Sequence, residues 1–267
     1  MTDAGAPGPT GDALVARLRA AGCVFAEDEA AVLREAAADA AELDELAARR
    51  VAGEPLEQVV GYAELDGLRL AVAPGVFVPR QRTVVLAREA ARLAAAVAGR
   101  PAVVVDLCCG VAAVGALVAA RVPGAVVHAA DVDPAAVAVA RRNLPGGRVT
   151  TGDLFGALDP AVRGGVDVLA ANAPYVPTEA IATMPPEARL FESTVALDGG
   201  PDGLDVQRRV VAGAPAWLAP GGHVLVETSE RQAAASEEAF RAVGLVDVRT
   251  VHDDELDGTV VVGRRRP

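Results

Sequence analysis

The spacing of apolar positions divides this chain into a helical first part and an alternating second part. Between residues 11 and 57, apolar residues recur at the spacing of one helix face, as Leu14 and Leu18 do. Gly22 and Gly53 are natural helix ends. We therefore predict a helical N-terminal domain over residues 11–57, preceded by a disordered lead over residues 1–10.

A short stretch with a two-residue period follows this domain. Residues 62–72 alternate between apolar and polar side chains and contain Asp66-Gly67, a dipeptide typical of tight hairpin turns. We predict a β-hairpin connector over residues 58–82, and then a helix from about residue 83 to residue 98.

From residue 83 to residue 267 the pattern alternates between strands and helices. Apolar strands are expected at residues 103–107, 126–131, 148–151, 166–171 and 223–228, with helical segments between them. Such alternation predicts an α/β fold, in which a parallel sheet carries helices on both faces. A closing pair of strands, 246–251 and 259–262, suggests an antiparallel edge strand.

Acidic residues lie at or just after the ends of the first three strands of this domain, where doubly wound sheets bind their ligands. They are Asp106, Asp131 and Asp153. Each acid alone is more typical of a turn or a helix cap, but their joint placement favours a nucleoside ligand. The loop after Asp106 lacks the G-x-G-x-x-G spacing of dinucleotide sites. Without a phosphate cradle it suits S-adenosylmethionine, whose cationic end a carboxylate such as Asp106 would attract.

The fourth strand ends at a polar tetrapeptide, Asn172-Ala173-Pro174-Tyr175. The chain has two asparagines and two tyrosines, and one of each lies here. Asparagine and proline are also ordinary turn residues, so the tetrapeptide alone leaves a structural and a chemical interpretation open.

Composition narrows the choice of partners and compartment. The formal net charge of −11 argues against a protein that grips nucleic acid through phosphates. Three cysteines with no zinc-ligand spacing predict no metal site and a reduced, cytoplasmic protein. We expect no signal peptide and no membrane span.

These residues and their order resemble class I S-adenosylmethionine-dependent methyltransferases, and more narrowly the HemK/PrmC family of protein N5-glutamine methyltransferases. Residues 76–83 resemble that family's VLIPRPxTE segment, residues 106–112 its D-x-G-x-G-x-G loop, and residues 172–175 its N-P-P-Y motif. The resemblance implies a Rossmann-like, seven-stranded sheet and S-adenosyl-L-methionine as cofactor. It implies cofactor contacts from Asp106, Cys108, Cys109, Gly110, Val111, Ala112, Asp131, Val132, Asp153, Leu154 and Asn172.

The resemblance also implies a substrate, the glutamine side chain in the GGQ loop of a peptide chain release factor. Asn172 Oδ1 and the Ala173 carbonyl would each accept one N–H of the substrate amide, Pro174 would hold the backbone extended, and Tyr175 would pack on the flat amide. This would be catalysis mainly by positioning. The helical domain over residues 11–57 would bind the protein substrate.

The chain departs from the family pattern at several positions. Cys108 and Ala112 replace glycines, and a positive φ would make each replacement costly. Ala173 and Ser193 replace prolines, and Val84 replaces a glutamate. Three alternatives therefore stay open: a methyltransferase of a small-molecule amide or amine, a methyltransferase of a nucleic-acid exocyclic amine, and a non-catalytic interaction module.

Overall fold

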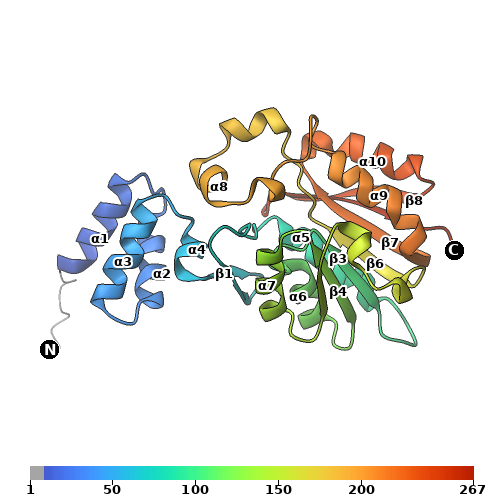
Figure 1. Cartoon of the computed structure of the whole chain (residues 1–267), viewed down its shortest axis with the longest axis horizontal. Coiled ribbons are helices and arrows are strands. Elements are labelled where there is room, and N and C mark those ends of the chain that lie inside the picture. Colours follow the sequence, from blue (N-terminus) through green and yellow to red (C-terminus); the bar gives the residue numbers. More distant parts are fainter. Residues whose placement is uncertain (1–8) are drawn as a thin grey trace.

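A small helical bundle precedes the main domain and lies at one end of the molecule (Figure 1). The computed structural model describes residues 9–267. The lead predicted over residues 1–10 lies outside them, except for its last two residues, where α1 begins. The bundle contains α1 (Pro9–Ala20), α2 (Ala26–Ala36), α3 (Ala40–Val51) and the short α4 (Leu56–Val60). Leu18, Leu33 and Ala47, all fully buried, form the centre of its own apolar core.

A β-hairpin follows the bundle. Strands β1 (Tyr62–Leu65) and β2 (Leu68–Ala71) pair antiparallel. The two turn residues, Asp66 and Gly67, have φ of 49° and 82°. Positive φ at both central positions is what the right-handed twist of a two-residue hairpin requires.

The main domain is built on a seven-stranded sheet of order β5-β4-β3-β6-β7-β9-β8. Five parallel strands come first: β3 (Val103–Leu107), β4 (Val126–Asp131), β5 (Arg148–Thr151), β6 (Val166–Ala171) and β7 (Leu218–Thr228). The chain runs outward from β3 to β5 and then returns to place β6 on the other side of β3. The crevice where the strand order reverses is therefore at β3 and β6. The predicted α/β class and Rossmann-like sheet are confirmed.

The closing pair gives the sheet an antiparallel edge strand, as predicted, although the last strand of the chain is not the one at the edge. Strand β9 (Gly258–Arg264) is antiparallel to both neighbours and lies inside the sheet, and β8 (Val246–Asp253) takes the edge. The reason is burial: β9 is buried along almost its whole length, whereas β8 alternates between half-buried and exposed residues. An apolar strand is favoured inside the sheet, where neighbouring strands pair both of its edges and helices cover both of its faces.

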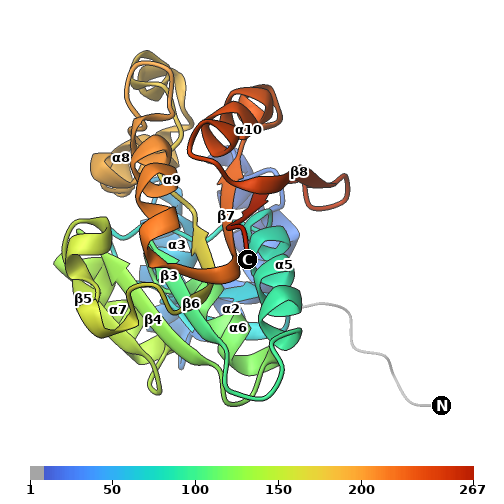
Figure 2. The ribbon, with the colours of Figure 1, turned by 90° about the vertical axis from the view of Figure 1, so that its right-hand side faces the viewer.

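Helices cover both faces of the sheet (Figures 1 and 2). Helices α5 (Thr83–Ala95), α6 (Ala113–Arg121) and α7 (Pro134–Asn143) pack on one face, and α9 (Asp205–Trp217) and α10 (Ala233–Ala242) on the other. Each face of the sheet has its own apolar core, and successive residues of the central strands point into opposite cores, as Val104 and Val105 of β3 do. Short 3-10 turns occupy Leu154–Ala157, Pro160–Val162, Thr178–Thr183, Thr194–Ala196 and Glu230–Gln232.

A segment between β6 and α9 carries α8 (Pro186–Phe191) and connects the bundle to the main domain. Arg50 of α3, 8% exposed, binds Glu29 within the bundle and Glu187 of α8, with N–O distances of 2.6 and 2.7 Å. Gln58 of α4 donates to the Phe191 carbonyl. These contacts place the bundle beside α8.

Candidate active site

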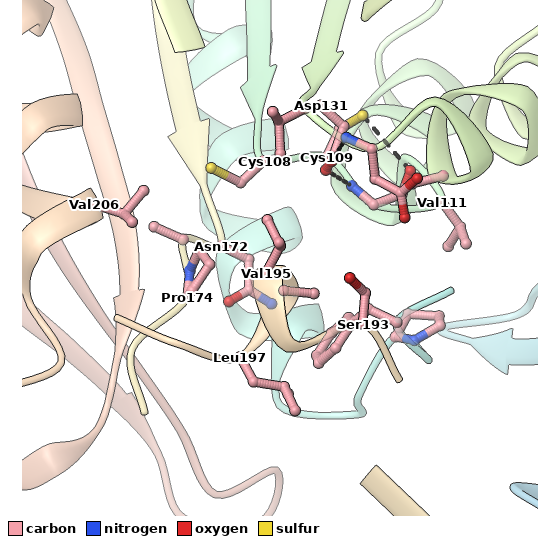
Figure 3. A pocket seen from close by; sticks show the side chains of 18 of the residues that line it. Cys108, Cys109, Val111, Asp131, Asn172, Pro174, Ser193, Val195, Leu197 and Val206 are labelled. Carbon is pink, nitrogen blue, oxygen red and sulfur yellow. Dashed lines mark hydrogen bonds between the residues drawn. The ribbon is translucent and has the colours of Figure 1, made fainter. Parts of the chain in front are cut away.

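A cavity of about 680 Å³ opens at the carboxyl ends of the central strands (Figure 3). Its walls come from the loops after β3, β4, β5 and β6, from the connector before α5, and from the α8 segment. The structure thus brings the predicted cofactor residues and the tetrapeptide 172–175 into one cavity. Of the predicted residues, only Ala112 does not line it; its side chain is fully buried.

Asp106 is the most deeply buried acid of this cavity, with 1% exposure. Its Oδ2 accepts a hydrogen bond of 2.9 Å from the Gly115 backbone N–H at the start of α6. Burial raises the pKa of Asp106 to about 8, and the Gly115 N–H opposes that rise. A cationic ligand beside the carboxyl would favour its ionised form. Asp106 is therefore suited to the positive end of S-adenosylmethionine.

Asp131 holds the shape of the loop after β3. Its two oxygens accept from the backbone N–H groups of Gly110 and Asp133, at 2.8 and 2.9 Å. Burial raises the pKa of Asp131, and these N–H groups oppose that rise. An ionised carboxylate has about four lone-pair sites, so Asp131 can still accept from ribose hydroxyls.

Asp153 lines the cavity as half of an ion pair. It pairs with Arg209 of α9 at 2.5 Å, and both side chains are more than half exposed. Arg209 also lines the cavity. Sequence reasoning missed this arginine because α9 lies far along the chain from the loop after β5.

Three residues of the cofactor loops adopt left-handed backbone angles. The φ values are 53° at Cys108, 61° at Ala112 and 45° at Leu154. Non-glycine residues rarely adopt this region because Cβ crowds the following carbonyl. Cys108 and Ala112 stand where the family pattern has glycine, and both have backbone angles that only glycine adopts without strain.

The tetrapeptide follows β6 and is held from several directions. Asn172 Nδ2 donates to Thr83 Oγ1 at 3.3 Å, which turns Oδ1 away from Thr83. The Tyr175 hydroxyl donates to Glu227 Oε1 at 3.4 Å, and the Tyr175 carbonyl accepts from Gln232. Burial raises the pKa of Tyr175, so its phenol stays neutral.

Two glycines pack directly beneath this motif. A Cβ at Gly199 would lie 2.6 Å from the Pro174 carbonyl oxygen, and one at Gly203 would lie 2.3 Å from the Tyr175 carbonyl oxygen. Such close approach of backbone to backbone admits only glycine.

Asn143, the other asparagine of the chain, supports the cofactor loop from α7. Its Oδ1 accepts from the Ala71 N–H, and its Nδ2 donates to the carbonyls of Ala71 and Val111. One side chain thus joins the hairpin to the loop after β3. Its position at the end of a helix gave no sign of this role in the sequence.

In the part of the chain that the structure describes, no cluster of three or more His, Cys, Asp and Glu side chains could hold a metal ion. None of the described helices is long and apolar enough to cross a membrane.

The sheet order, the cavity at its switch point and the acids that line it define an S-adenosylmethionine-dependent methyltransferase of class I. A family model described as "Methyltransferase small domain" matches residues 70–195. A solved methyltransferase from Pyrococcus furiosus shares this fold, with a TM-score of 0.56 and 18% identity over 76% of this chain and 91% of that one. A T. thermophilus 16S rRNA methyltransferase in complex with AdoMet and guanosine gives a TM-score of 0.54 at 23% identity, over 77% of this chain and 50% of that one.

The chain belongs to the release factor glutamine methyltransferase family. It is 38% identical to the Geobacter sulfurreducens release factor glutamine methyltransferase over 82% of this chain and 76% of that protein. It is 34% identical to the Caulobacter vibrioides protein of the same name, over 100% of this chain and 93% of that protein. A Streptomyces pristinaespiralis relative has another name, 4-amino-L-phenylalanine/4-methylamino-L-phenylalanine methyltransferase, with 40% identity over 73% of this chain and 68% of that protein. The resemblance seen in the sequence is confirmed.

Proposed function

We propose that this protein methylates the side-chain amide nitrogen of a glutamine in a peptide chain release factor. The observation that carries the proposal is the placement of Asn172 in the cavity that also contains Asp106 and Asp131, with Nδ2 held by Thr83. The amide oxygen of Asn172 is then available to accept a hydrogen bond from a substrate NH₂ group. The names of the relatives support a release factor as the partner.

The cofactor fits the residues present. S-adenosylmethionine, when bound, supplies an electrophilic methyl group. Asp106 would lie near its cationic end, Asp131 would accept from its ribose hydroxyls, and the remaining loop residues would enclose it. These are Cys108, Cys109, Gly110, Val111, Val132, Asp153 and Leu154, which line the cavity, with Ala112 supporting the loop from beneath.

The chemical problem is the weak nucleophilicity of an amide nitrogen, whose lone pair is delocalised into its carbonyl. Asn172 Oδ1 and the Ala173 carbonyl would each accept one N–H of the substrate, so that the face of the nitrogen points at the methyl group. Fixing the two reactants in this way lowers the barrier through orientation rather than through a base. The new bond from nitrogen to the methyl carbon would replace the methyl–sulfur bond, which leaves a neutral thioether, and the substrate nitrogen, made acidic by the transfer, would release its N–H proton to water.

The rest of the cavity wall suits a flat, partly apolar acceptor. Pro174 restricts the residue before it to extended angles, and Tyr175 offers a neutral aromatic ring. The helical bundle over residues 11–57 contacts α8 through the Arg50–Glu187 ion pair, and Glu187 also lines the cavity, so we place the contact with the protein substrate at this bundle. All three cysteines are free, which fits a reducing cytoplasm.

A second candidate acceptor is a small aromatic amine. The amino-phenylalanine methyltransferase is as similar to this chain as the release factor enzymes are. An aniline NH₂ is also planar and could meet the same two acceptors. Ala173 and Ser193 line the cavity where the family pattern has proline, so the acceptor side of the site is where this chain varies. The net charge of −11 disfavours a nucleic-acid acceptor.

The test is methyl transfer to a purified release factor, read by mass spectrometry of the GGQ peptide, with 4-amino-L-phenylalanine assayed in parallel. We expect one added methyl group on the glutamine. Asn172→Ala should lower transfer by about 100-fold, since it removes one of two positioned acceptors and leaves a buried N–H unpaired. Cofactor affinity, measured by calorimetry, should stay unchanged.

The outcomes separate the candidates. Turnover of the aromatic amine without methylation of the release factor would favour the small-molecule acceptor. Cofactor binding without transfer to either acceptor would refute the proposal, and loss of cofactor binding in Asn172→Ala would assign Asn172 to the cofactor instead.

A further inference from the structure

Arg82 is a cation in the wall of the cavity that the proposed chemistry does not use. It is the residue before α5, and its side chain makes no hydrogen bond to the start of that helix. The side chain is 40% exposed, and a buried acid, Glu227, lies 4.0 Å from its Nε. Within residues 9–267 no hydrogen bond holds the guanidinium. Its N–H donors are therefore available to a ligand.

The other arginines of the cavity wall are each held by a carboxylate. Among the described residues that line the cavity, these arginines are Arg80 and Arg209. Arg80 Nη2 lies 2.5 Å from Glu192 Oε1, and Arg209 Nη2 lies 2.5 Å from Asp153 Oδ2. Close, charge-assisted pairs of this kind occupy the donors of a guanidinium. Arg82 is therefore the cavity arginine that can bind a ligand without first breaking a close ion pair.

The contacts of Arg82 place it on the acceptor side of the cavity. Arg82 Nε and the Tyr175 hydroxyl approach the same atom, Glu227 Oε1, at 4.0 and 3.4 Å. Thr83, the next residue of the chain, accepts from Asn172 Nδ2. Glu227 is 1% exposed and does not line the cavity, and it approaches the guanidinium from the Nε side. The two terminal nitrogens of Arg82 are thus left for a ligand beside Asn172 and Tyr175.

We propose that Arg82 forms a carboxylate-binding subsite beside the acceptor motif, so that the cavity also takes a free amino acid whose side chain ends in a planar NH₂ group. The terminal edge of a guanidinium presents two parallel N–H groups that match the two oxygens of a carboxylate. The NH₂ group would lie at Asn172 and the carboxylate at Arg82. This inference rests on the proposed function for the place of the NH₂ group, and it adds an acceptor class to the protein glutamine.

The charges and the position of the subsite decide which anion fits it. Arg82 is one cation with a buried acid beside it, so it can balance a single negative charge, which suits a carboxylate better than a phosphate dianion. The cofactor also carries a carboxylate, on its methionine end. The cofactor acids Asp106 and Asp131 belong to β3 and β4, whereas the contacts of Arg82 lead to Tyr175, after β6. The position of Arg82 therefore favours the carboxylate of the acceptor.

The first test measures binding without turnover. The protein is saturated with S-adenosylhomocysteine, the cofactor without its methyl group, and titrated in a calorimeter with 4-amino-L-phenylalanine or with 4-(2-aminoethyl)aniline, which differs only by the missing carboxylate. We expect the wild-type protein to bind the amino acid about tenfold more tightly, the effect of one charge-assisted hydrogen-bonded pair. Arg82→Gln should abolish this preference, and Arg82→Lys should keep part of it, since lysine retains the charge without the parallel N–H groups.

Arg163→Gln is the matched control for the loss of one positive charge. Arg163 is exposed and lies in the loop before β6, at the amino end of the strand and so at the edge of the sheet opposite the cavity. It should leave the preference for the carboxylate unchanged. An equal loss of preference in Arg163→Gln and Arg82→Gln would overturn the inference, because the effect would then come from overall charge. So would a wild-type protein that binds neither compound or binds both equally well.

The second test separates the two sources of a carboxylate. We expect S-adenosylmethionine to bind wild-type protein and Arg82→Gln with equal affinity. If Arg82→Gln weakens S-adenosylmethionine but not its decarboxylated form, Arg82 binds the cofactor and the inference is wrong. The proposed function fails separately: a carboxylate preference that depends on Arg82, without methylation of a release factor, would refute the protein acceptor and support this subsite. Methylation of the release factor without any carboxylate preference would refute the subsite alone.

Discussion

The left-handed backbone at Ala112 allows a direct measurement of the free energy of unfolding that is lost because a non-glycine residue stands in the cofactor loop. Ala112 is the residue before α6, with φ 61° and ψ 41°, and its methyl group is fully buried. Its neighbour Ala113 is also buried but begins α6 with ordinary helical angles. Replacing each of them by glycine removes the same methyl group, so the two variants differ chiefly in backbone strain.

The magnitudes can be worked out for each variant. Loss of one buried methyl group costs about 0.8 kcal/mol, and the added freedom of glycine in the unfolded chain costs about 0.5–1 kcal/mol. Ala113→Gly should therefore lower the free energy of unfolding by about 1.3–1.8 kcal/mol. Ala112→Gly has the same costs, but it relieves about 1–2 kcal/mol of left-handed strain, so its net effect should be close to zero.

The assay is denaturant unfolding of the cofactor-free protein, with thermal melting as a second probe. For a chain of this length, a difference of about 1–2 kcal/mol between the variants corresponds to a few degrees in Tm. Equal destabilisation by Ala112→Gly and Ala113→Gly would refute the reasoning, because it would mean that the left-handed angle at Ala112 is not strained. Cys108→Gly, at φ 53°, should resemble Ala112→Gly.

Three further predictions test other parts of the site. Cofactor affinity should rise with pH through about 8, since the ionised form of Asp106 attracts a cation; an equal pH dependence in Asp106→Asn would assign the effect to the cofactor's own amino group. Asn143→Ala should lower the free energy of unfolding by about 2 kcal/mol, since it leaves the backbone groups of Ala71 and Val111 unpaired. It should also weaken cofactor binding, measured by calorimetry; unchanged binding would show that the hydrogen bonds of Asn143 do not support the cofactor loop. Gly199→Ala should abolish methyl transfer by displacing the Pro174 carbonyl, whereas Gly156→Ala, where a Cβ meets nothing within 4 Å, should not; an active Gly199→Ala would contradict the close packing.

Much of the fold could be predicted because local chemistry and tertiary structure agree. Asp66-Gly67 forms the turn of the hairpin with positive φ at both residues. Asp133 caps α7 with its side chain and Pro134 takes the first helical position. In each case the residue type has its own conformational preference, so a few neighbouring residues are enough to predict the turn or the helix start.

The site was predictable only where its residues follow a strand. Asp106, Asp131 and Asn172 lie at strand ends, and a parallel sheet brings such ends together. Arg209 and Asn143 reach the site from helices, and their partners, Asp153 and the backbone of the hairpin and cofactor loop, depend on how those helices pack. Helix packing is a tertiary property that one sequence does not show.

The strand register gives the site its geometry and explains how the motif can vary. Asp106 pairs with Ala170 across β3 and β6, so Asn172 lies two residues beyond the cofactor acid on the same face of the sheet. Glu227 follows on β7, on that same face. The distance between the cofactor end and the acceptor end is therefore set by three adjacent, buried strands. Ala173 replaces proline in a loop whose position these strands and the glycines beneath it already fix, and it retains the carbonyl that the proposed chemistry needs.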